Sequence, residues 1–142
     1  MKKLKRLICI FTAVALAMAV LGCGKKTAEA EPESRESGIP ISVTVNIDGS
    51  AADEEGFSIG GSEKVEIFEG DSALDALIAA GKNLGYEIRW NDDYVTYIGD
   101  LGEKSCGPAS GWMYDVNGEM PSESIVKYIV NDGDTVTFSF WK

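Results

Sequence analysis

Residues 111–118 read GWMYDVNG, and the rest of the fold prediction is built outward from this run. Every second residue from Trp112 to Val116 is large and apolar or aromatic, the period of two that is typical of a strand with one buried face. Asn117-Gly118 follows at once and supplies the two residue types that most readily adopt positive φ. We therefore expect a strand over residues 112–116 that ends in a tight turn.

The same alternation recurs on both sides of this strand. It predicts further strands, which we place at residues 41–47, 64–68, 86–90, 94–98 and 135–141. A short helical turn at 122–124 and a strand through 128–130 are also expected. Residues 49–61 and 99–111 show no period and are expected to be loops.

One helix is expected between residues 72 and 85. Its apolar residues fall on one stripe, and Ser72 with Asp75 three positions later fits a capping box. Gly85 fits the position just after the helix. A single helix with several strands has to cover one face of a sheet, so we predict an α+β fold, with one helix on a curved, mostly antiparallel sheet. A β-grasp arrangement is the natural form of such a fold.

Composition narrows the function classes. The 142 residues carry 13 basic and 23 acidic side chains, a formal net charge of -10, and no histidine. Such a charge disfavours nucleic acid as a partner, and the lack of histidine removes the common catalytic triads and imidazole metal sites. We find no metal-binding pattern, no phosphate-binding loop and no catalytic residues, so we expect a binding protein that requires no cofactor and is not an enzyme.

The first 38 residues resemble an export and attachment segment. A basic start is followed by an apolar run of about 15 residues, which is short for a membrane span but normal for a signal peptide. The run ends in Val20-Leu21-Gly22-Cys23, which resembles the lipobox of bacterial lipoproteins. The resemblance implies a signal peptide at 1–22 and lipidation of Cys23, while an uncleaved membrane anchor is the alternative. Residues 23–38 are polar and acidic and form the expected linker to a domain at 39–142. Both readings place this domain outside the cytoplasm and attached to the cell membrane.

The run at 111–119, Tyr128, the Asp132-Gly133-Asp134 turn and the aromatic last strand together resemble the transcobalamin-like C-terminal domain family. The likeness covers roughly residues 65–141 and includes the expected helix. Members occur in bacterial secreted proteins and lipoproteins and are similar to the β-domain of vertebrate cobalamin carriers. The resemblance implies a β-grasp-like module with cobalamin or a related corrinoid as ligand. In those carriers a large helical domain covers the other side of the ligand. A β-domain alone would offer only part of that contact surface, so tight binding here would need another chain to complete the site.

This resemblance directs attention to an aromatic strand and its neighbours. The candidate ligand-binding residues are Gly111, Trp112, Tyr114, Asn117 and Tyr97. The alternative for Trp112 and Tyr114 is that they belong to the core, and for Asn117 that it only shapes the turn. Cys106 is an odd cysteine that either pairs between chains or stays free.

Two functions of different class remain open. The first is a membrane-tethered module that binds a corrinoid for uptake. The second is a docking module with no small-molecule ligand, which contacts a surface protein or transporter through a sheet edge or an aromatic patch. A concave site beside Trp112 and the loop at residues 99–111 would favour the first, and a flat exposed edge the second.

Overall fold

The computed structural model describes residues 38–142. The expected signal peptide at 1–22, Cys23 and the linker up to residue 37 lie outside the described residues. Within residues 38–142, no helix combines the length and the apolar character that a membrane span requires.

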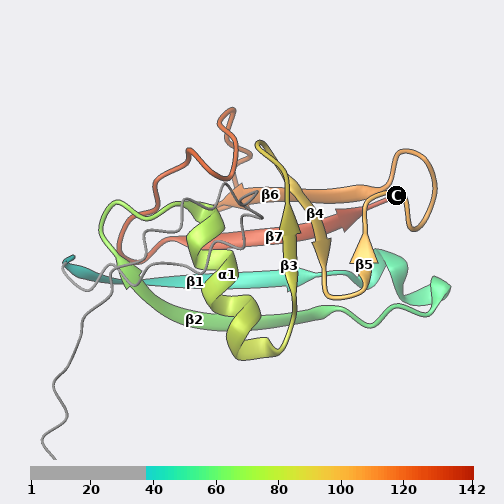
Figure 1. Cartoon of the computed structure of the whole chain (residues 1–142), viewed down its shortest axis with the longest axis horizontal. Helices are drawn as coiled ribbons and strands as arrows, with labels where there is room; N and C mark the ends of the chain where they lie inside the picture. Colours follow the sequence, from blue (N-terminus) through green and yellow to red (C-terminus); the bar gives the residue numbers. More distant parts are fainter. Residues whose placement is uncertain (1–37) are drawn as a thin grey trace, which may run out of the picture. The chain divides into compact units, whose positions relative to one another are not determined.

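The described chain forms two sheets, one α-helix and one short 3-10 helix (Figure 1). The larger sheet has the strand order β2-β1-β7-β6, and the smaller has the order β3-β4-β5. The strands are β1 (Pro40–Asp48), β2 (Gly60–Phe68), β3 (Ile88–Trp90), β4 (Val95–Ile98), β5 (Leu101–Gly102), β6 (Gly111–Val116) and β7 (Thr135–Trp141); the helices are α1 (Ala73–Leu84) and η1 (Ser50–Glu55). Only the β1–β7 pairing is parallel. The α+β class and the mostly antiparallel pairing are confirmed.

The helix begins and ends where its sequence predicts. The Ser72 side chain accepts the backbone N–H of Asp75, and the Asp75 carboxylate accepts the backbone N–H of Ser72, which is the reciprocal capping box. Gly85 ends the helix with a φ of 80°, a left-handed conformation that costs glycine little. The apolar stripe of the helix, with Leu74 and Leu77, faces the sheets.

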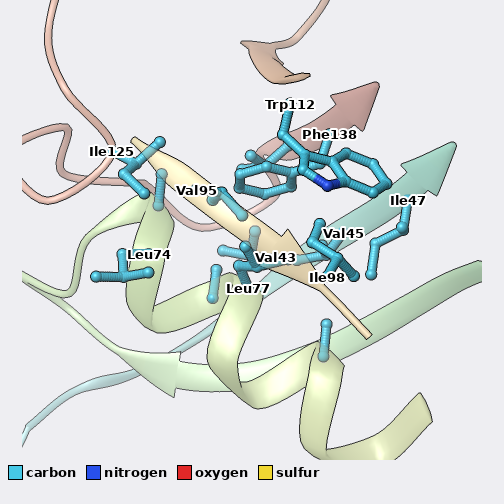
Figure 2. Packing of buried hydrophobic residues seen from close by; sticks show 14 of the residues in the cluster. Val43, Val45, Ile47, Leu74, Leu77, Val95, Ile98, Trp112, Ile125 and Phe138 are labelled. Atoms are coloured by element: carbon cyan, nitrogen blue, oxygen red, sulfur yellow. The ribbon is translucent and has the colours of Figure 1, made fainter. Parts of the chain in front are cut away.

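The core lies between the larger sheet and a layer made of α1 and the smaller sheet. Figure 2 shows Val43, Val45 and Ile47 of β1 pointing toward Leu77 of the helix and Ile98 of β4. Trp112 of β6 and Phe138 of β7 are also buried and extend the core along the larger sheet. The alternation that predicted these strands is therefore the alternation of core and solvent along each one.

The segment 122–130 differs from its prediction in two places. The helical turn expected at 122–124 is absent, and a turn lies at 125–127 instead. Residues 128–130 form no strand; only an isolated bridge joins Ile129 to Ser72. Instead, the carbonyl groups of Tyr128 and Ile125 accept the free N–H groups of Ala73 and Leu74 in the first turn of the helix. Residues 125–130 therefore pair with the start of the helix and not with a strand of either sheet.

The two stretches expected to be loops contain short regular elements. Residues 49–61 contain η1, whose Glu55 pairs with Lys142 at 3.0 Å, and also the beginning of β2. Residues 99–111 contain β5, which pairs with β4. The prediction of one curved sheet was also wrong in this respect, because the strands form two separate sheets.

Candidate ligand-binding cleft

A cleft of about 220 Å³ opens beside β6. Three segments meet there: residues 93–95 at the tip of the β3–β4 hairpin, residues 112–114 of β6, and most of the segment 120–125. The hairpin tip is fixed by Asn91, whose side chain accepts the N–H groups of Asp93 and Tyr94. The cleft is therefore built from parts of the chain that are distant in sequence.

The rim of the cleft is apolar and open to solvent. Tyr94, Met113 and Met120 are 45%, 46% and 54% exposed, respectively. The floor, in contrast, is buried core, with Trp112, Ile125 and Phe138 among its residues. Exposed large apolar side chains around a rigid floor are typical of a surface that contacts a ligand.

Tyr114 ties the segment 120–125 to β6. Its hydroxyl donates to the carbonyl of Glu123 at 2.6 Å, and its ring stacks on Phe138 with the centroids 6.0 Å apart. Burial, with smaller contributions from Tyr128 and Glu123, raises the pKa of Tyr114 to about 12. The hydroxyl therefore stays protonated and keeps this hydrogen bond at physiological pH.

The cleft wall also contains polar and charged groups. The Ser124 hydroxyl is the one buried side-chain oxygen or nitrogen within residues 38–142 that has no hydrogen-bond partner. Asp93 and Glu123 contribute carboxylates, and no lysine or arginine is among the described residues that line the cleft. The site therefore has an apolar rim, a negative charge and, buried behind its wall, a hydroxyl without a partner among the described residues.

Trp112 is chiefly a core residue. Only 5% of it is exposed, its indole N–H donates to the carbonyl of Leu101 at 2.9 Å, and its ring meets Phe140 edge to face at 5.3 Å. It contributes to the floor of the cleft but offers little surface. The alternative that placed Trp112 in the core is the one that the packing supports.

Three of the candidate residues do not line the cleft. Asn117 has a φ of 53°, and its side chain bonds Asp134 and the N–H of Thr135, so it shapes the turn. The Tyr97 ring packs so closely on Gly102 that a Cβ there would lie 2.1 Å from it. Gly111 precedes the cleft residues on β6, and neither it nor any other residue of the stretch 99–111, which was expected to border the site, is among them.

The residues that form the rim were not among the candidates. The candidate list contains none of the three rim residues Tyr94, Met113 and Met120. One usable signal is that Met113 stands opposite Trp112 and Tyr114 in the alternation, so it had to face solvent. The position of Met120 follows from tertiary packing alone.

A second cleft of about 340 Å³ is polar and more open. Asp48, Asp53 and Tyr86 are among its residues, and hydrogen bonds from Ser50 lower the pKa of Asp48. The Tyr86 hydroxyl is already paired with the backbone of Gly60. No group of three or more potential metal ligands occurs in the part of the chain that the structure describes.

The fold resembles solved structures at low sequence identity. Haptocorrin, solved in complex with Cbi, matches with a TM-score of 0.58 and 19% identity over 75% of this chain. A protein from Ruminococcus gnavus ATCC 29149, described as a candidate metal binding protein, matches with a TM-score of 0.49 and 14% identity over 72% of this chain and 97% of its own. This chain spans 26% of the haptocorrin chain, so the likeness concerns one part of that protein.

No curated protein matches the sequence. A family profile, in contrast, matches residues 70–142, which include α1, the β3–β4 hairpin, β6, the cleft-lining residues 120–125 and β7. This match covers half of the chain. The chain therefore belongs to the DUF4430 family, a domain of unknown function.

Proposed function

We propose that this protein is a membrane-tethered module outside the cytoplasm that binds a small ligand at the cleft beside β6, and that the ligand is cobalamin or a related corrinoid. The observation that carries the proposal is the cleft itself, with its exposed rim of Tyr94, Met113 and Met120. The fold shared with haptocorrin, which was solved with Cbi bound, is what suggests the ligand class.

The chemistry of the cleft suits a flat ligand with polar substituents. Aromatic and thioether side chains contact apolar ring surfaces through dispersion and adapt to irregular shapes. Ser124 lies in the cleft wall, and its buried hydroxyl, which has no partner within residues 38–142, would pair with a ligand amide once its side chain turns toward the cleft. Corrinoids combine a broad macrocycle with amide side chains, so they offer both kinds of contact.

The size of the cleft limits how much of the ligand it covers. A volume of about 220 Å³ is below the roughly 300–1,000 Å³ of sites that enclose a drug-sized molecule. The cleft would therefore hold one edge or substituent of a macrocycle. We propose that a second chain covers the remainder, in agreement with the small share of haptocorrin that this domain matches.

The N-terminal segment is the basis for the proposed cellular location of the domain. We propose cleavage before Cys23, lipidation of Cys23, and a linker up to residue 38 that holds the domain away from the membrane. We further propose that the fold is a β-grasp variant. The antiparallel β1–β2 pair, the helix after it and the parallel β1–β7 pairing support this.

Titration of the full chain in a mild detergent with cobalamin and with its base-free precursor tests the proposal. We expect a saturable change in corrinoid absorbance. Tyr94→Ala should weaken binding about tenfold, because one rim aromatic contributes on the order of 1–2 kcal/mol. Trp90→Ala is the matched control, since Trp90 is 46% exposed on the same hairpin but does not line the cleft.

Two results would contradict the proposal. One is the absence of any spectral change at high micromolar corrinoid. The other is equal weakening by Tyr94→Ala and Trp90→Ala, which would place the contact away from the cleft. Docking to a surface protein is the alternative function, and it is favoured by the position of β6 at the end of the larger sheet, where its outer side pairs with no other strand of residues 38–142.

A further inference from the structure

The larger sheet ends at β6. This strand pairs with β7 on one side, and no strand of residues 38–142 pairs with its other side. An open strand edge presents backbone N–H and C=O groups that can pair with another chain.

The hydrogen bonds around β6 show which backbone groups lie at that open edge. Asn117 donates its N–H to the carbonyl of Thr135, the first residue of β7, whereas Val116 donates its N–H to the carbonyl of Glu119 on the outer side. Because pairing alternates along an antiparallel strand, Trp112 and Tyr114 direct their backbone groups outward, as Val116 does. The bridge to Glu119 occupies the backbone groups of Val116. The outward backbone groups of Trp112 and Tyr114 therefore have no partner strand within residues 38–142.

The opposite edge of the sheet differs in its side chains. Strand β2 contains Glu63, Lys64 and Glu66, and charged residues along an edge discourage pairing. Strand β6 contains one charged residue, Asp115. The edge beside the cleft therefore lacks the protection that the other edge carries.

The cleft follows this open edge. It is lined by Met113 from one face of β6 and by Trp112 and Tyr114 from the other face. A cavity that reaches side chains of both faces lies along the edge of the strand. The side chains of an added strand would alternate between the same two faces.

The charge of the cleft defines the kind of partner. Asp93 and Glu123 line it without a compensating lysine or arginine in the described lining, and both are exposed. We propose that the edge of β6 binds an extended segment of another polypeptide, bearing lysine or arginine between apolar residues, which adds as a strand beside Trp112 and Tyr114. This inference does not depend on corrinoid binding.

The test uses a capped seven-residue peptide in which valine and lysine alternate, titrated into the full chain in a mild detergent. Two further peptides carry N-methyl groups on one or the other alternate set of residues. Only one set can face β6, so we expect one of the two to bind about tenfold more weakly and the other to bind as the parent does. Peptide binding should also slow hydrogen exchange at the amides of Trp112 and Tyr114.

Charge is tested separately with a double variant. Asp93→Asn with Glu123→Gln should weaken binding several-fold at low salt, and the difference should shrink as salt is added. Glu66→Gln with Glu69→Gln is the matched control, because it removes the same charge at and just beyond the other edge and should leave affinity unchanged.

Several outcomes would overturn the inference. They are no binding at millimolar peptide, equal loss with both methylated peptides, equal loss with both charge variants, or protection of Trp112 and Tyr114 by self-association without peptide. The last outcome would assign the edge to a second copy. Corrinoid absorbance is recorded independently, so failure of one proposal leaves the other open to its own test.

Discussion

Replacing Trp112 by alanine tests whether the central aromatic residue of β6 holds the fold together. The side chain is 5% exposed, contacts Phe140 edge to face and donates its indole N–H to the carbonyl of Leu101. Truncation of a buried tryptophan costs about 3–5 kcal/mol. A small domain has only about 5–15 kcal/mol of stability, so Trp112→Ala should remove a large part of it.

Trp112→Phe separates packing from hydrogen bonding. Phenylalanine keeps most of the aromatic contact but leaves the carbonyl of Leu101, a fully buried residue, without its donor. An unsatisfied buried acceptor costs about 1–3 kcal/mol, so this variant should fall between the wild type and Trp112→Ala. Trp90→Ala is the control, because this tryptophan is 46% exposed and its loss should cost less than about 1 kcal/mol.

Urea and thermal unfolding of the full chain, followed by far-ultraviolet circular dichroism, measure these differences. For a domain of this size a loss of about 4 kcal/mol lowers the melting temperature by at least about 15 °C. A loss of less than about 1 kcal/mol of unfolding free energy in Trp112→Ala would refute a central packing role for Trp112. An equal loss in Trp90→Ala and Trp112→Ala would do the same. A folded Trp112→Phe protein with unchanged corrinoid affinity would also show that Trp112 acts through the floor of the cleft and not by direct contact.

Three further predictions concern the turn, the cleft and the anchor. Asn117→Ala should cost about 2 kcal/mol, whereas Asn117→Gly should cost less because glycine relieves the positive φ and only the two side-chain hydrogen bonds are lost; urea unfolding distinguishes the two, and equal losses would exclude a backbone contribution. The pKa of Tyr114 is raised to about 12, so its contribution to stability is complete below pH 10 and is lost as pH rises toward 12; Tyr114→Phe should remove that part of the alkaline decline, and an unchanged decline would contradict the assignment. Cys23→Ser should release the protein from the membrane fraction, and continued lipid-dependent fractionation would refute lipidation at this residue.

Local sequence signals were sufficient for the elements whose stability is local. The capping box of Ser72 and Asp75 and the glycine at 85 set both ends of the helix. The alternation of β1, β6 and β7 identified which side chains enter the core. Such signals are reliable because each element satisfies most of its backbone groups and apolar residues in a pattern that the sequence itself displays.

Residues 128–130 show where local reasoning fails. Tyr128, Ile129 and Val130 have high strand propensity, yet their backbone contacts the beginning of the helix and the residue before it. Propensity reports how well a residue suits an extended backbone but not which partner that backbone meets. The partner here is a helix terminus about 55 residues earlier in the chain, and only the tertiary structure brings the two together.

The same reasoning explains why the cleft escaped prediction while its floor did not. Trp112 and Tyr114 became candidates through a family resemblance that rests on a strand pattern, and such a pattern selects residues for burial. Tyr94, Met113 and Met120 are exposed, come from three different segments, and share no period. A binding surface needs side chains that the core does not use. In this domain the alternating apolar residues of the strands form the floor of the cleft, and residues outside that alternation form its rim. A large apolar residue on the solvent side of a strand's alternation is therefore a better indication of the site. Among the rim residues, only Met113 of β6 has this position.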